Sequence, residues 1–159
     1  MGTYSGRERG FTLIELLIVG IIVGILATLV AATYSGVKAK DRNAQRQTDI
    51  QQVQSQLEIY YAKHSKYPSL AELNDADWRT KNMNTLKNDS ISDPSWKKDS
   101  GCSKNDTATF VGAPAKNCYS YQATTADGSA CLDAKIDCAQ YTLTASFEGG
   151  EKYVKSSLN

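Results

Sequence analysis

The chain has 159 residues, of which 18 are basic and 17 acidic, so its formal net charge is +1. A charge this close to zero argues against a protein that holds nucleic acid by bulk electrostatics, because such proteins carry a strong basic excess. The length fits one domain with an anchoring segment rather than two domains.

Residues 1–10 form a short polar leader that contains Arg7 and Arg9. An ordinary secretory signal is cleaved after its apolar stretch, usually at an Ala-x-Ala site. No such site follows the apolar stretch that begins at Phe11. We therefore expect the apolar stretch to remain in the mature protein.

Residues 11–36 carry no charged side chain except Glu15. About 22 helical residues rise roughly 33 Å, which is enough to cross the hydrocarbon core of a bilayer. We therefore predict a transmembrane helix here. A carboxylate inside such a helix costs on the order of 2.5–3.5 kcal/mol. From the residues alone, Glu15 either lies at the level of the lipid headgroups or has a partner and a task.

Residues 37–64 are predicted to continue the same helix with an amphipathic face. No proline occurs between Thr33 and His64. Apolar side chains recur there at helical spacing, and most polar side chains fall on the other faces. Pro68 ends the helix because it cannot continue the hydrogen-bond ladder. The apolar positions are Val37, Ala44, Ile50, Val53, Leu57, Tyr60 and Tyr61.

The start of the apolar stretch resembles the prepilin cleavage and methylation motif of type IV pilins and pseudopilins. The resemblance implies that a membrane peptidase cleaves between Gly10 and Phe11 and methylates the new amine of Phe11. It also implies that Glu15 is required for assembly into a homo-oligomeric helical filament. The further partners that it implies are an assembly ATPase and a platform membrane protein. The matching residues are Gly10-Phe11-Thr12-Leu13-Ile14-Glu15-Leu16-Leu17.

Glu15 has a physical reason to matter in such a filament. Cleavage would leave an α-amine on Phe11, and an α-amine is mostly cationic at neutral pH. A buried carboxylate and a buried ammonium are each costly alone, but they largely cancel as a pair. We therefore expect Glu15 of one subunit to meet the amine of a neighbour and so set the register of the filament.

The resemblance has one departure and leaves one conflict. Many pilins carry a proline at the position of Ala32, so any melting of this helix in a filament must rely on Gly20, Gly24 and the β-branched side chains. Charges that flank the helix place its C-terminal side in the cytoplasm. The resemblance places the head outside the inner or cytoplasmic membrane, as a single-pass protein that later joins an extracellular filament. We follow the resemblance on this point.

Residues 65–159 are predicted to form a globular head, which makes the fold α+β. Ser69 caps a short helix, and residues 74–101 read as a polar loop with a few apolar anchors. Strands are predicted at 118–124, 139–147 and 152–155, because apolar and polar side chains alternate there between turn signals. We expect an antiparallel sheet of three or four strands that lies on the long helix.

All four cysteines lie in this head. No Cys-x-x-Cys pair occurs and the chain has one histidine, so a zinc site is poorly supported. An even number in an extracellular part favours two disulfides, and pairing of nearest neighbours is preferred among three possible connectivities. That pairing joins Cys102 to Cys118 and Cys131 to Cys138. Buried reduced thiols are the alternative.

Evidence for catalysis or cofactors is thin. His64 lies at the predicted end of the helix, and no Ser/His/Asp set or glycine-rich phosphate loop occurs. We therefore expect no enzyme, no catalytic residue and no metal. Asp127, Asp133 and Asp137 are a possible calcium site, although turns and solvated charges explain them better.

We therefore interpret the chain as a structural subunit of a type IV pilus filament. Two alternatives to this interpretation stay open. The first is a pseudopilin of a type II secretion or DNA-uptake system. The second is a singly anchored surface binding protein that does not polymerise. The last alternative leaves Glu15 and the Gly10–Phe11 junction unexplained.

Overall fold

The computed structural model describes residues 10–159, except for the side chains of residues 30–33 and 35. The predicted leader residues 1–9 lie outside the described part. The chain divides into two compact units, Met1–Lys38 and Ala39–Asn159. Helix α1, Leu13–His64, contributes to both units, and its backbone stays helical through Ala32.

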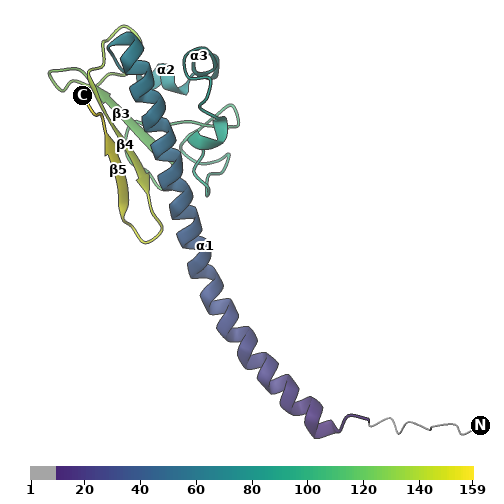
Figure 1. Cartoon of the computed structure of the whole chain (residues 1–159). Coiled ribbons are helices and arrows are strands. Elements are labelled where there is room, and N and C mark those ends of the chain that lie inside the picture. The colour runs from purple at the N-terminus through teal and green to yellow at the C-terminus, as the bar shows by residue number, and fades with distance from the viewer. Residues whose placement is uncertain (1–9) are drawn as a thin grey trace, which may run out of the picture. The chain divides into compact units, whose positions relative to one another are not determined.

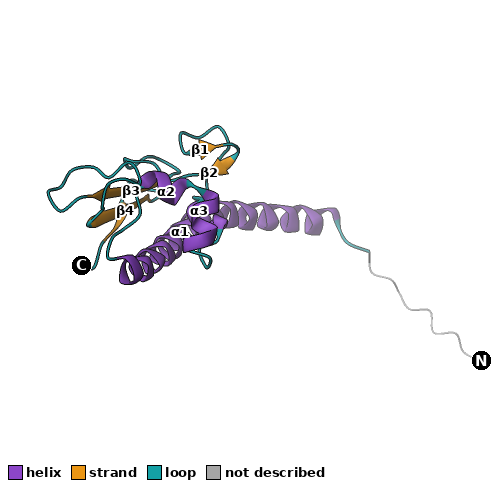
Figure 2. Ribbon diagram, turned by 90° about the horizontal axis from the view of Figure 1, so that it is seen from above, coloured by secondary structure: helices purple, strands orange, loops and turns teal. Residues whose placement is uncertain are grey.

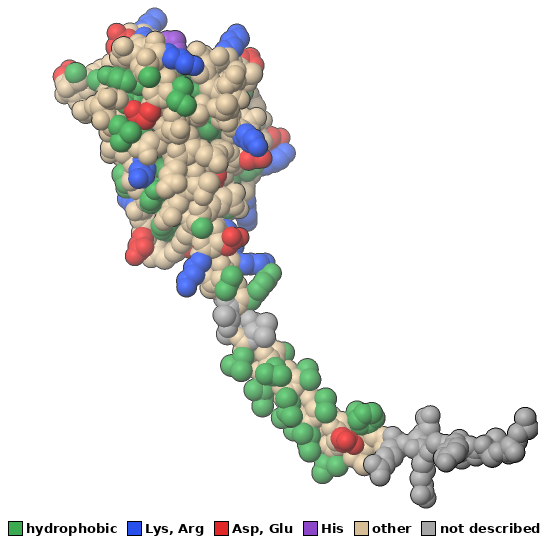
Figure 3. Space-filling view, in the orientation of Figure 1, with side chains coloured by type: hydrophobic (Ala, Val, Ile, Leu, Met, Phe, Trp, Pro, Cys, Tyr) green, Lys and Arg blue, Asp and Glu red, His purple; other side chains and the backbone are tan. Residues whose placement is uncertain are grey.

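The first unit contains the N-terminal part of α1. Every side chain described between residues 10 and 38 is exposed. Hydrophobic side chains cover much of this helical surface (Figure 3). A helix that is apolar on all sides is normally buried in protein or in a membrane. The described side chains of this segment instead form an exposed apolar surface.

The second unit combines the rest of α1 with a small sheet and short helices (Figures 1 and 2). From here on, the whole unit Ala39–Asn159, and not only residues 65–159, is called the head. The sheet is antiparallel with the strand order β3-β4-β5. The fold is therefore the predicted α+β arrangement of a helix packed with a small antiparallel sheet. The remaining elements are α2 (Leu70–Asn74), α3 (Ala76–Asn82), η1 (Asn88–Ile91), β1 (Ser103–Lys104), β2 (Thr107–Ala108), β3 (Tyr119–Thr124), β4 (Gln140–Ser146) and β5 (Lys152–Ser156).

The core of the head lies where α1 meets this sheet. Ile50, Val53 and Leu57 on α1 are fully buried in one cluster with Tyr121 and Leu143 of the sheet. Burying a large apolar side chain contributes roughly 1.5–3 kcal/mol each. From Ile50 onward the amphipathic face predicted from the spacing is therefore the face that packs, whereas its first two members, Val37 and Ala44, are exposed.

The polar side of α1 differs from the prediction. Arg46 and Asp49 were expected mostly among the solvated faces, but both are buried. Arg46 donates from Nε to Asp93 Oδ2 at 2.7 Å, and Tyr119 donates its hydroxyl to Asp49 Oδ2 at 2.7 Å. Burial raises the pKa of Asp49. Helical spacing cannot reveal this burial, because Asp93 lies 47 residues after Arg46 in the sequence and Tyr119 lies 70 residues after Asp49.

Residues 74–101 contain more regular structure than the predicted loop. The Ser69 cap was predicted correctly, and it forms a reciprocal capping box with Glu72. Helix α3 follows directly, because the Asp75 carboxylate accepts from the backbone N–H of Trp78 and caps its start. The short hairpin of β1 and β2 was also missed, since each strand has only two residues.

Two disulfides join nearest neighbours in the head, Cys102 to Cys118 and Cys131 to Cys138. A cross-link removes loop-closure entropy from the unfolded chain, and the effect grows with the length of the loop. The two loops differ, with sequence separations of 16 and 7.

This difference gives a testable order of stabilities. We expect replacement of both Cys102 and Cys118 by serine to lower the free energy of unfolding by about 3 kcal/mol. Replacement of Cys131 and Cys138 should cost less, about 2 kcal/mol. Urea unfolding of the full chain in detergent measures both variants. A larger loss for the shorter loop would contradict this account.

The turn between β4 and β5 is fastened to α1 by Glu148. The Arg42 guanidinium donates to both carboxylate oxygens of Glu148, and the backbone N–H of Glu148 donates to Asn43 Oδ1 at 3.0 Å. These hydrogen bonds from Arg42 lower the pKa of Glu148 from its usual 4.5 to about 2. Glu148 therefore stabilises the head only while it is ionised.

The consequence is a pH dependence with a defined sign. Because the folded-state pKa is depressed, the stabilisation is complete above pH 4.5 and is lost as the pH falls towards 2. We expect the Glu148→Gln variant to lose less stability over this window than the parent chain. Thermal midpoints measured at several pH values test this, and parallel curves for the two proteins would refute it.

Candidate functional site

The predicted cleavage junction lies in irregular chain just before α1. Gly10 and Phe11 precede the helix and are exposed, with 77% of the Phe11 surface accessible. A side chain at position 10 would meet no atom within 4 Å. Both sides of the Gly10–Phe11 bond are therefore sterically open in the described structure.

Glu15 takes part in a cap at the start of α1. The backbone N–H of Glu15 donates to Thr12 Oγ1 at 3.3 Å, and the backbone N–H of Thr12 donates to Glu15 Oε2 at 3.4 Å. This reciprocal pair is a capping box, which satisfies two free N–H groups at a helix start. Thr12-x-x-Glu15 is the sequence signal for this capping box, which was not among the predicted features.

The same geometry leaves Glu15 available for a second partner. Its side chain lies at the exposed helix start, where the dipole of the helix favours a negative charge. Within the described residues it forms no ion pair. The carboxylate is thus held in place by its own helix while its charge remains uncompensated.

The large apolar side chains described after Glu15 are exposed. From Leu16 to Leu29 the large hydrophobic side chains are between 50% and 62% exposed. Measured by length and hydropathy together, no helix in the described part of the chain qualifies as a membrane span. The division into a transmembrane part, 11–36, and an amphipathic part, 37–64, stays a prediction.

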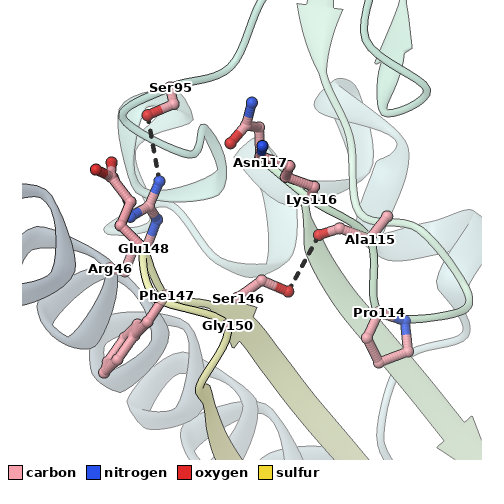
Figure 4. A pocket seen from close by; sticks show the side chains of 11 residues that line it. Arg46, Ser95, Pro114, Ala115, Lys116, Asn117, Ser146, Phe147, Glu148 and Gly150 are labelled. Atoms are coloured by element: carbon pink, nitrogen blue, oxygen red, sulfur yellow. Dashed lines mark hydrogen bonds and ion pairs between the residues drawn. The ribbon is translucent and has the colours of Figure 1, made fainter. Parts of the chain in front are cut away.

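The head contains a pocket whose polar lining groups bond to neighbouring residues of the fold. The pocket of about 650 Å³ lies between the β4–β5 turn, the loop before β3 and Arg46 (Figure 4). Arg46 donates to Ser95 Oγ and Ser146 donates to the carbonyl of Ala115, so these polar groups already have partners. The lining has no histidine or cysteine, and its single carboxylate, Glu148, is paired with Arg42.

The three aspartates of the possible calcium site are engaged separately. Asp127 accepts from Ser129 N at 3.1 Å, Asp133 from Lys135 N at 2.9 Å, and Asp137 from Lys66 Nζ at 2.7 Å. Among residues 10–159, as far as they are described, no group of three or more metal-binding side chains is placed to hold an ion. His64 is exposed and stacks on Tyr60.

Residues 5–31 match a family described as the prokaryotic N-terminal methylation motif. The chain is 41% identical over 63 residues to the type II secretion system core protein G of Dickeya chrysanthemi, and 40% identical over 68 residues to that of Pectobacterium carotovorum. The chain is also 29% identical over 68 residues to the type IV major pilin protein PilA of Myxococcus xanthus. It is thus similar to type IV pilins and pseudopilins, and the match to the methylation motif lies within residues 5–31.

The likeness to these relatives covers less than half of the chain. The matches cover 40% and 43% of this chain and 41% and 44% of the two core proteins G. For the Myxococcus pilin they cover 43% of this chain and 31% of the pilin. The chain thus spans less than half the length of these relatives. No solved structure matches the chain.

Proposed function

We propose that this protein is a structural subunit of a type IV pilin-like filament, and that it acts as a pseudopilin. The observation that carries the proposal is the exposed Gly10–Phe11 junction, followed by Glu15 and by a helix whose described apolar side chains are exposed. A prepilin peptidase would cleave the junction and methylate Phe11. The apolar helices of many copies would then cover one another in the filament core.

The assembly route follows from the same surface. Before assembly, the uncovered apolar helix would anchor the subunit in the inner or cytoplasmic membrane with the head outside. Extraction removes this surface from lipid, so helix–helix packing must replace those contacts. Gly20 and Gly24 would permit close approach because they carry no side chain. An assembly ATPase and a platform protein would drive the extraction.

The likeness to core proteins G supports a pseudopilin over a pilin of long surface fibres. Three of those relatives are 36–41% identical to this chain over the matched residues, against 29% for the Myxococcus pilin. A long type IV pilus is the second candidate, and the Myxococcus match is the observation that favours it. A role in catalysis has no support from the pocket or from the acids of the head.

Cell fractionation separates the candidates. A pseudopilin at native levels should remain with the cell envelope after shearing, already cleaved at Phe11. Long fibres in the sheared fraction would instead establish the pilus. An uncleaved chain in cells with active peptidase would defeat both proposals and favour a simple anchored protein.

A further inference from the structure

The head buries two arginines, and they are compensated very differently. Arg46 is 1% exposed and forms two hydrogen bonds to the carboxylate of Asp93. Arg79 is 3% exposed, yet it donates only to neutral acceptors, the carbonyl of Leu73 at 2.7 Å and Asn88 Oδ1 at 3.3 Å. No carboxylate of the described residues forms an ion pair with Arg79.

This contrast also appears in the electrostatics. The hydrogen bond to Asp93 raises the pKa of Arg46, whereas burial lowers the pKa of Arg79. A buried charge without a counter-charge is expensive, and arginine is rarely buried fully unless it is paired. The nearby charge of Asp75 raises the pKa of Arg79, but burial lowers it by more. Arg79 is therefore buried with incomplete charge compensation.

Arg79 lines a pocket that has room for one. The pocket, of about 280 Å³, lies between α2, the start of α3 and the β1–β2 hairpin. Lys104 of the hairpin also lines it and forms no ion pair within the described residues. The only carboxylate in the lining is Asp75, which accepts from Trp78 N as the cap of α3. The lining thus carries two positive charges and one negative charge.

We propose that this pocket binds an oxyanion group, a phosphate or a carboxylate, whose charge compensates Arg79. A planar guanidinium has five N–H donors whose fork geometry matches such groups, and the bonds to Leu73 and Asn88 engage two of them. Lys104, which is exposed, adds a second cation to the lining. The proposal does not depend on the filament function, since the pocket lies wholly within the head.

Titration of the full chain in detergent with inorganic phosphate, and separately with acetate, tests the proposal by calorimetry. We expect saturable binding of at least one of the two anions at millimolar concentration, and the tighter anion identifies the group. Lys104→Gln should weaken binding about threefold, the effect of one partly exposed charge. Lys116→Gln, in the separate 650 Å³ pocket, is the matched control and should not change it.

Asp75→Asn provides the decisive variant. Asparagine caps a helix as well as aspartate does, so α3 should keep its start while the negative charge is lost. Anion affinity should then rise about threefold, again the effect of a single charge. If Asp75 itself is the counter-charge that Arg79 needs, the parent chain will bind neither anion and the variant will be less stable. That result, or an unchanged anion affinity in the Asp75→Asn variant, would overturn the proposal.

Discussion

Replacing Glu15 with glutamine should abolish filament assembly while leaving cleavage after Gly10 intact. Glutamine serves in a capping box as glutamate does, so the cap with Thr12 should survive. Only the negative charge is lost. An ammonium left unpaired in a packed core costs about 3–5 kcal/mol, which corresponds to a factor of at least about a hundred in subunit association.

Two readouts are needed for this variant. Mass spectrometry of the membrane fraction reports whether the chain begins at Phe11, and chemical cross-linking in the envelope reports multimers of the subunit. Glu151→Gln, an exposed acid of the head, is the matched control and should assemble normally. Normal multimers from the Glu15→Gln chain would show that the carboxylate is not what aligns the subunits.

Replacing Asp93 with asparagine should destabilise the head more than the loss of either disulfide. The change keeps the shape of the side chain but removes the buried counter-charge of Arg46, which then keeps only its longer contact with Glu148 at 3.5 Å. Breaking a buried ion pair on one side costs about 3–5 kcal/mol. Urea unfolding followed by the fluorescence of Trp78 and Trp96 measures the loss.

An exposed ion pair provides the comparison. Lys98 and Asp106 are 69% and 71% exposed at their side chains, so Asp106→Asn should leave the unfolding midpoint unchanged. Equal midpoints for the Asp93 and Asp106 variants would mean that burial of Arg46 contributes nothing special. The amount of assembled Asp93 variant should decrease only in proportion to the fraction of its heads that is folded.

The elements that were predictable are those written in local patterns. The long helix has uninterrupted apolar spacing up to Pro68, and β3, β4 and β5 alternate apolar and polar side chains. Helix α1 ends at His64 as expected, and the strands begin or end within one or two residues of the predicted bounds. The Glu15 position was recognisable because its motif is contiguous.

The features that were missed depend on contacts between distant residues. Arg46 looks like a solvated helix residue until Asp93 is brought beside it by the fold. Arg79 likewise gives no local sign that it is buried. Helix α3 is a partial exception, since Asp75 before an apolar tryptophan was a readable capping signal.

We infer that this chain is processed at its N-terminus before it assembles. Intact mass spectrometry of the protein purified from cells tests the processing step and the disulfides in one measurement. We expect a chain that starts at Phe11, carries one added methyl group and is four hydrogens lighter than the reduced form. A chain that still begins at Met1 in cells with an active prepilin peptidase would contradict it.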